Sequence, residues 1–340
     1  MGRVITFGEI MLRLSPPDYL RLGQGATLSC SYGGAESNVA LSLSEFGLEA
    51  AFVSKLPYTP IAEGALRTLR GWGVDVAHVA RGGKRMGIYF LEKGASVRPS
   101  LCVYDREGSS IQTASQADFD WQRIFRGADW FHFTGITPAL GGHLADICDD
   151  ACKTAKQMGL TVSCDLNYRG KLWTKQQAHA TMGKLCRHVD VCVCNEEDAA
   201  DVFGIAAEDS DIHAGKLSKS AYRAVAEKLS DLFGFTHVGI TLRSSYSASD
   251  NAWAGMLYTQ GKAFFSKEYR LHLVDRVGGG DSFGAGLIYS IISGMDSDRS
   301  INFAVAASAL KQTIEGDFNR ISVSEVEHLM KNGGAGRISR

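Results

Sequence analysis

The sequence has no excess of charge of either sign and no long apolar run, and both absences argue against whole classes of function. Its 340 residues carry a net charge of -1, which favours neither nucleic acid nor a membrane surface as a partner. No apolar run approaches the roughly 18 residues that a membrane-spanning helix needs. Residues 1–7 are typical of a first strand and not of a signal peptide. We therefore expect a globular, cytoplasmic protein.

The eight cysteines lack the spacing of a metal site, since no Cys-x-x-Cys pair occurs and no histidine falls at a metal-finger distance. Cys148 and Cys152 are spaced as on one helical turn, whereas Cys192 and Cys194 alternate along a strand-like run. Unpaired cysteines in apolar surroundings are usually small core residues. We therefore expect core thiols, without disulfides, in a reducing compartment.

Short apolar runs of strand character alternate with helical patterns through most of the chain. The expected strands cover residues 4–7, 51–54, 130–134, 161–165, 189–194 and 237–241. The expected helices cover residues 37–46, 63–71, 142–158, 222–233, 282–292 and 299–313. This alternation predicts helices on both faces of a parallel sheet, and the length allows one large α/β domain or two smaller ones. Ligands of such sheets bind at the carboxyl ends of the strands.

Two segments interrupt the alternation, at residues 12–32 and 83–111. Both are rich in Gly, Pro, Tyr and Arg, and residues 89–91 and 101–104 are typical of neighbouring strands. These strands are too few to form an independent domain. We expect them to form a small β-sheet that lies over the main sheet as a lid.

The run Gly278-Gly279-Gly280-Asp281 precedes an apolar helical pattern and combines two chemical properties. Glycines let the backbone come close to a ligand, and the free N–H groups of a helix start bind phosphate. A carboxylate at the same place can accept a proton from a hydroxyl that attacks a phosphoryl group. The combination indicates phosphoryl transfer. The alternative is a tight turn in which Asp281 is merely the N-cap of the helix.

A second glycine pair, Gly33-Gly34, precedes a helix that carries Asn38 near its start. An asparagine amide donates and accepts hydrogen bonds, which suits sugar hydroxyls. Taken alone, this motif is equally compatible with an ordinary loop.

Together the two motifs resemble the signatures of the ribokinase-like (PfkB) carbohydrate kinases. The matching patterns are Gly33-Gly34-x-x-x-Asn38-x-Ala40 and Asp275-x-x-Gly278-Gly279-Gly280-Asp281. The Gly-x-x-x-x-Gly-Lys-Ser/Thr pattern of P-loop enzymes does not occur. The resemblance implies a single domain over residues 1–340, a three-layer α/β/α fold with a mostly parallel central sheet, and ATP and Mg²⁺ as cofactors. It also implies that Asp281 is the catalytic base and that Gly278, Gly279 and Gly280 form an anion hole.

Two further segments extend the resemblance toward the nucleotide. Asn195 and Asp198 follow the run 189–194, where the family usually has Asn-x-x-Glu linked to Mg²⁺ and phosphate. A carboxylate of either length can hold Mg²⁺ through water, and Glu197 could share this role. The alternative is a solvated acidic helix start. Thr241 and Arg243 match a Thr-Leu-Arg form of the family, which implies that they approach the ATP phosphates together with Gly278 and Gly280.

Two arginines indicate that the substrate is a sugar acid. Arg106 follows a strand of the lid and Arg169 follows the expected strand 161–165. Guanidinium groups bind carboxylates through two parallel hydrogen bonds, which a neutral sugar does not need. The segments around both arginines are similar to the 2-keto-3-deoxygluconate kinases of the family. The resemblance implies phosphorylation at the 6-hydroxyl, with these contacts to the keto-deoxy acid: Gly34, Tyr89, Tyr104, Arg106 and Arg169.

Three other functions remain open at this point: a fructokinase or other sugar kinase, a nucleoside kinase, and a non-catalytic sugar-binding module. Paired arginines argue against the first two, and an intact Asp281 argues against the third. The substrate can derive from gluconate or from galactonate. Some relatives hold a monovalent cation, for which positions near Asp275 are suitable. Exposed strand edges in the lid predict a dimer that forms through it.

Overall fold

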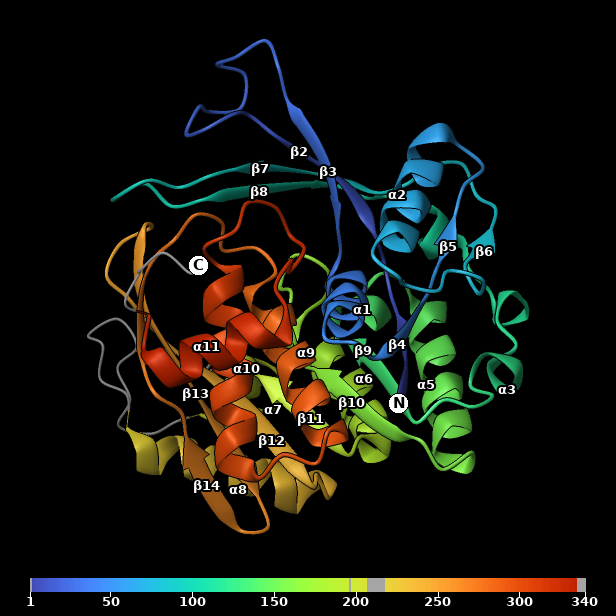
Figure 1. The fold of residues 1–340 in the computed structure, drawn as a ribbon. Coiled ribbons are helices and arrows are strands. Elements are labelled where there is room, and N and C mark those ends of the chain that lie inside the picture. The colour runs from blue at the N-terminus through green and yellow to red at the C-terminus, as the bar shows by residue number, and fades with distance from the viewer. Residues whose placement is uncertain (1, 196, 207–217, 335–340) are drawn as a thin grey trace.

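The computed structural model describes residues 2–195, 197–206 and 218–334, and within them a central sheet of nine strands (Figure 1). Six neighbouring strands are parallel, in the order β4 (Glu49–Val53), β1 (Arg3–Phe7), β9 (Trp130–Thr134), β10 (Thr161–Asp165), β11 (Val191–Cys194) and β12 (His237–Ser245). The sheet continues with antiparallel pairs of β13 (Asp250–Thr259) with β12, β14 (Lys262–Phe265) and β15 (Tyr269–His272). Most residues of the parallel strands are buried, as expected where both faces of a sheet are covered.

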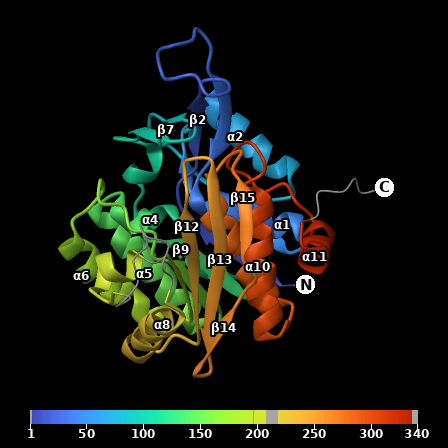
Figure 2. The same cartoon turned by 90° about the vertical axis from the view of Figure 1, so that its left-hand side faces the viewer.

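Two layers of helices enclose this sheet (Figure 2). One face packs against α3 (Trp121–Ile124), α5 (Gly142–Gln157), α6 (Lys175–Leu185), α7 (Asp198–Phe203) and α8 (Lys219–Phe233). The other face packs against α1 (Ala35–Glu45), α9 (Gly279–Ile292), α10 (Ser297–Lys311) and α11 (Val323–Asn332). Further elements are α2 (Pro60–Gly71), α4 (Ile136–Ala139), the strand pair β5 (Lys55–Leu56) and β6 (Ala80–Arg81), and 3₁₀ turns at 110–113, 116–118 and 186–188. The predicted three-layer α/β/α architecture is confirmed.

A four-stranded sheet, which we call the small sheet, lies next to the carboxyl ends of the parallel strands (Figure 1). Its order is β3 (Ser29–Gly33), β2 (Met11–Ser15), β7 (Ile88–Glu92) and β8 (Leu101–Asp105). β7 and β8 are antiparallel neighbours with Tyr89 opposite Tyr104, as predicted for residues 89–91 and 101–104. Because β2 follows closely after β1 and β3 leads directly into α1, the small sheet is joined to the main sheet at its ligand-binding edge.

Several predicted boundaries were wrong, among them the starts of α2 and α8, which lie at Pro60 and Lys219 instead of residues 63 and 222. β12 continues to Ser245 instead of ending at Thr241, because its second half pairs with β13, a partner that the sequence pattern did not reveal. Helix α9 begins at Gly279 instead of Ser282. Gly278 is its N-cap and has a φ of 81°, a left-handed conformation that glycine adopts easily. The alternative in which Asp281 caps the helix is therefore also wrong.

All eight cysteines are free thiols. Six of them are buried, as expected, but Cys30 is exposed and Cys102 is only partly buried. These two lie on the small sheet, which helices do not cover on both faces, so the prediction of core thiols fails for them. Within the described ranges, no helix combines the length and the apolar character needed to cross a membrane.

Candidate active site

A cavity of about 1740 Å³ lies between the carboxyl ends of the parallel strands and the small sheet, and we call it the central cavity. Apart from Glu197, its lining includes the residues to which the sequence analysis gave a role: Gly34, Asn38, Tyr89, Tyr104, Arg106, Arg169, Asn195, Asp198, Thr241, Arg243, Gly278, Gly279, Gly280 and Asp281. The fold thus brings the two glycine motifs, about 240 positions apart in the chain, to one place. The individual roles of these residues stay predictions.

The glycine turn presents the N-terminus of α9 to the central cavity. A side chain at Gly278 would lie 2.1 Å from the carbonyl oxygen of Asp317, so only glycine fits there. At Gly280, in contrast, a Cβ atom would meet nothing within 4 Å, because this residue faces the open cavity. Backbone N–H groups in the first turn of a helix lack intrahelical partners and carry partial positive charge. The turn can therefore bind an anion.

Asp281 is the third residue of α9 and lines the central cavity. Its Oδ2 accepts a hydrogen bond of 2.6 Å from Nδ2 of Asn38. Burial raises the pKa of Asp281 to about 6, against the opposing effects of the Asn38 hydrogen bond and of Arg169 and Lys311. A carboxylate with a pKa near 6 is largely ionised at neutral pH and is a better proton acceptor than an ordinary aspartate.

Asn38 connects the two glycine motifs. Besides donating to Asp281, its Oδ1 accepts a bond of 3.3 Å from the N–H of Gly34. A side chain at Gly34 would lie 1.9 Å from the carbonyl oxygen of Glu9, which explains the glycine. We expected Asn38 to bind sugar hydroxyls, and that contact stays a prediction. The structure adds a second function that the motif did not reveal, which is to orient Asp281.

Two further carboxylates, Asp165 and Asp198, line the cavity at the ends of β10 and β11. The Asp198 carboxylate accepts the N–H groups of Asn195 and Tyr168 at 3.1 and 3.0 Å. In return, Oδ1 of Asn195 accepts the N–H of Asp198 at 2.9 Å, so the two residues bind each other at the start of α7. Burial raises the pKa of Asp198, and burial beside Asp198 and Asp281 raises that of Asp165. Glu197, in contrast, is exposed and does not line the cavity.

No group of three or more His, Cys, Asp or Glu side chains in the described part of the chain could hold a metal ion directly. Asn195 and Asp198 both reach the cavity, but their oxygens are engaged by backbone N–H groups. This donor set fits a magnesium ion that is held through water and not one bound by protein ligands alone.

Aromatic and cationic side chains of the small sheet line another part of the cavity. The rings of Tyr89 and Tyr104 stack at 5.9 Å, and the guanidinium of Arg106 lies 4.5 Å above the Tyr104 ring. Nε of Arg106 also lies 3.4 Å from Oε2 of buried Glu9, a partner that the sequence did not predict. Part of the Arg106 charge is therefore balanced within the protein.

Tyr89 and Arg169 differ in what they offer a ligand. The hydroxyl of Tyr89 is 2.6 Å from both carboxylate oxygens of Asp317, so Tyr89 presents its ring to the cavity. Arg169 is exposed, and among the described residues its guanidinium forms no ion pair and donates only to the carbonyl of Tyr168 at 3.0 Å. Arg169 is therefore better placed than Arg106 to bind the carboxylate of a ligand. Thr241 and Arg243 lie on β12 at a different part of the lining.

A buried charge cluster beneath the glycine turn was missed from the sequence. The guanidinium of Arg13 on β2 contacts Asp275 at 2.5 Å and Asp317 at 2.7 Å, and all three side chains are almost fully buried. One signal was present, since Arg13 stands between two leucines in a strand. Such a position places a charge on the face opposite to the leucines, and a buried charge needs a partner.

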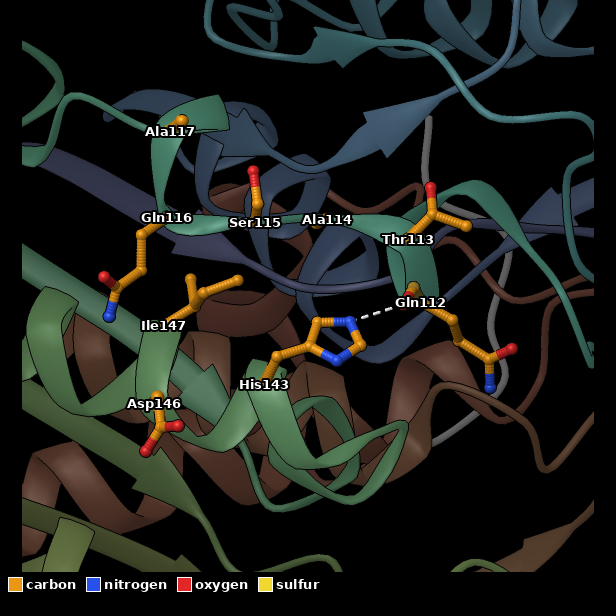
Figure 3. Close-up of a pocket in the computed structure, with 9 residues that line it drawn as sticks. All are labelled: Gln112, Thr113, Ala114, Ser115, Gln116, Ala117, His143, Asp146 and Ile147. Carbon is orange, nitrogen blue, oxygen red and sulfur yellow. Dashed lines mark hydrogen bonds between the residues drawn. The ribbon is translucent and has the colours of Figure 1, made fainter.

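A second pocket, of about 660 Å³, lies between the 3₁₀ turns at 110–118 and helix α5 (Figure 3). Nε2 of His143 approaches the carbonyl oxygen of Gln112 at 2.5 Å there. Its lining contains only two titratable side chains, His143 and Asp146, and none of the predicted site residues. The central cavity is therefore the stronger candidate.

Comparisons with known proteins agree with this geometry. Residues 1–320 match the model of the pfkB family of carbohydrate kinases. The chain is 33% identical over 338 residues to a 2-dehydro-3-deoxygalactonokinase of Haloferax volcanii, covering 98% of each sequence. It is 28% identical to a 2-dehydro-3-deoxygluconokinase of Bacillus subtilis, covering 94% of this chain and 93% of the relative. The solved structure of a 2-dehydro-3-deoxygluconokinase of Thermotoga maritima is 50% identical, with a TM-score of 0.94 and coverage of 97% and 98%.

We predict that Gly280→Ala folds normally but transfers phosphoryl groups poorly. The added methyl group has room in the fold, and alanine stabilises a helix by about 0.5–1 kcal/mol relative to glycine. It would stand where an anion approaches the turn, so kcat/KM should fall about tenfold or more. The matched control is Gly183→Ala in α6, which also adds a methyl in open space. Thermal unfolding and steady-state kinetics compare the two, and equal activity would contradict an anion site at Gly280.

Proposed function

The chain belongs to the pfkB family of carbohydrate kinases, and we propose that it uses ATP to phosphorylate the 6-hydroxyl of 2-keto-3-deoxygluconate. The observation that carries the proposal is the lining of the central cavity. It combines the carboxylate of Asp281, beside the glycine turn, with the exposed guanidinium of Arg169, which forms no ion pair with any described residue. The names of the relatives from Thermotoga maritima and Bacillus subtilis support the same substrate. The name of the relative from Haloferax volcanii supports the galactonate-derived acid instead, which is therefore the alternative substrate.

In this proposal Asp281 removes the proton of the 6-hydroxyl while the oxygen attacks the phosphoryl group. Asn38 holds the carboxylate in position, and the N–H groups of the first turn of α9 stabilise the charge on the phosphoryl oxygens. Arg169 and Arg106 bind the carboxylate of the sugar acid. Gly34 and the rings of Tyr89 and Tyr104 bound the sugar pocket.

The nucleotide occupies the remaining part of the cavity in this proposal. Bound ATP supplies the phosphoryl group and bound Mg²⁺ offsets its charge. In this proposal Asn195 and Asp198 hold the ion through water, and Thr241 and Arg243 contact phosphates; all four residues line the cavity. The small sheet covers the cavity and limits the access of water as a competing acceptor. We include no monovalent cation, because the ammonium group of Lys311 already contacts the carbonyl of Asp275.

We predict that Asp281→Asn lowers kcat by about 10²-fold or more with little change in KM, since the amide cannot accept the proton. For the unmodified protein, kcat/KM should fall about tenfold per pH unit below the pKa of Asp281, because protonation removes the base. Burial raises this pKa to about 6, so the decline should begin there. Asp298→Asn changes an exposed carboxylate of α10 and should retain full turnover. Normal turnover by Asp281→Asn would remove this residue from the role of base.

We predict that Arg169→Ala raises KM for the sugar acid about tenfold or more and leaves KM for ATP nearly unchanged, since hydrogen bonds between charged groups contribute about 1.5–3 kcal/mol. Arg299→Ala, at an exposed arginine of α10, should change neither value. The kinetic panel should include 2-keto-3-deoxygluconate, its galactonate-derived counterpart, fructose and ribose. Faster turnover of fructose or ribose than of both acids would overturn the proposed substrate.

We also propose that the protein is a cytoplasmic dimer that forms through the small sheet. In β7 and β8, Phe90 is paired with Val103, and strand alternation puts both on the face opposite to the paired Tyr89 and Tyr104, although Val103 also belongs to the residues that line the central cavity. Val103 is 43% exposed, and β3 and β8 leave both edges of the small sheet unpaired among the described residues. Light scattering should give twice the mass of one chain, and Val103→Glu should halve it. A monomeric unmodified protein at micromolar concentration would contradict the dimer.

A further inference from the structure

Lys311 is a fully buried lysine at the last position of α10, and its side chain does not line the central cavity. Its Nζ donates to the backbone carbonyl of Asp275 at 3.1 Å and to that of Ile314 at 3.4 Å. Burying an ammonium group is costly unless it is well paired. A buried lysine beside the catalytic turn therefore calls for an explanation.

The ammonium group of Lys311 neutralises the remaining negative charge of the buried cluster beneath the glycine turn. The positive charges of Arg13 and Lys311 oppose the negative charges of Asp275 and Asp317. Burial lowers the pKa of Lys311, while the carboxylates of Asp275 and Asp317 raise it. Without Lys311, the cluster would carry a net negative charge close to Asp281 and to the anion site of the glycine turn.

Lys311 also holds the backbone that leads into α9. Asp275, whose carbonyl it binds, begins the turn that ends at Gly278. A Cβ at Gly278 would lie 3.2 Å from Cε of Lys311, so the lysine stem packs directly beneath the turn. Other bonds from the end of α10 act in the same direction. Oγ of Ser308 donates to the carbonyl of Gly279 at 2.6 Å, and the carbonyl of Gln312 accepts the N–H of Asp275 at 3.2 Å.

We propose that the ammonium group of Lys311 is a built-in cation that positions the turn of residues 275–278, and that the kinase therefore needs no free monovalent ion there. Backbone carbonyls that converge on an ammonium group would equally attract NH₄⁺ or K⁺. Truncation of Lys311 should consequently convert a cation-independent enzyme into a cation-dependent one. The kinetic test of this inference rests on the proposed kinase function, whereas the unfolding test does not.

The unmodified protein provides the first test. Turnover of ATP and 2-keto-3-deoxygluconate should agree within about twofold between KCl and tetramethylammonium chloride at equal ionic strength, a comparison that holds screening constant. Tetramethylammonium is too large for a niche between two carbonyls and cannot donate hydrogen bonds. Turnover about fivefold or more higher in KCl than in tetramethylammonium chloride would overturn the proposal. This comparison uses only the unmodified protein, so it does not depend on whether a variant folds.

Lys311→Ala provides the second test. In tetramethylammonium chloride its kcat should fall about tenfold or more with little change in KM. The variant loses the hydrogen bonds that hold the turn and the positive charge that offsets the carboxylates. NH₄Cl or KCl should restore a large part of kcat. Lys311→Met fills the space of the stem without a charge and should not respond to either salt. Lys267→Ala is the matched control, because exposed Lys267 also donates to a carbonyl near a helix end, that of Met330 at 3.0 Å.

Thermal unfolding provides a readout that is independent of activity. NH₄Cl should raise the midpoint of Lys311→Ala by about 2 °C or more over tetramethylammonium chloride, since an ion bound only to the folded state stabilises it. The unmodified protein and Lys267→Ala should show no such difference. Full kcat of Lys311→Ala in tetramethylammonium chloride would overturn the proposal. If no sugar is phosphorylated at all, the proposed function fails, while the unfolding comparison still tests the cation niche.

Discussion

Asp317 occupies the space between the two glycine motifs, and the arrangement of the site depends on its contacts. A Cβ at Gly33 would lie 1.9 Å from its Oδ2, and one at Gly278 would lie 2.1 Å from its carbonyl oxygen. Its carboxylate is bound by the guanidinium of Arg13 at 2.7 Å and by the hydroxyl of Tyr89. One residue near the C-terminal end thus packs against the first motif, the last motif and two strands of the small sheet.

This arrangement limits how the small sheet can move. Arg13 on β2 is bound to Asp275 and Asp317 in a region almost closed to water. Separating a buried guanidinium from its carboxylates costs about 3–5 kcal/mol when one partner is left behind. A hinge at the base of β2 is therefore disfavoured. The same contacts connect the position of the small sheet to the turn that carries Asp281, because Asp275 begins that turn.

The carboxylates of the cavity differ in the partners that the backbone provides. Asp198 receives two N–H groups, which favour its ionised form and limit the rise of its pKa through burial. Within the described ranges, Asp281 receives a single side-chain amide donor, from Asn38. Opposing effects of burial and of Arg169 and Lys311 bring its pKa to about 6. A base close to neutrality therefore results from the surroundings of Asp281 and not from its residue type.

The alternation of strands and helices, the two glycine motifs and some of the residues that line the cavity could be predicted from the sequence, because each depends on local periodicity, on a short motif or on a resemblance to a known family. The sequence could not show that β12 extends to Ser245, because β13 supplies the missing hydrogen bonds. Nor could it show that Asn38 forms a hydrogen bond with Asp281, or that Arg106 forms an ion pair with Glu9. The partners of Lys311 are backbone carbonyls, which leave no signal in a residue pattern. Local pattern therefore determined the main alternation of strands and helices and the candidate residues of the two motifs. Only the tertiary structure decided which charges meet, because contacts between residues far apart in the chain follow from packing.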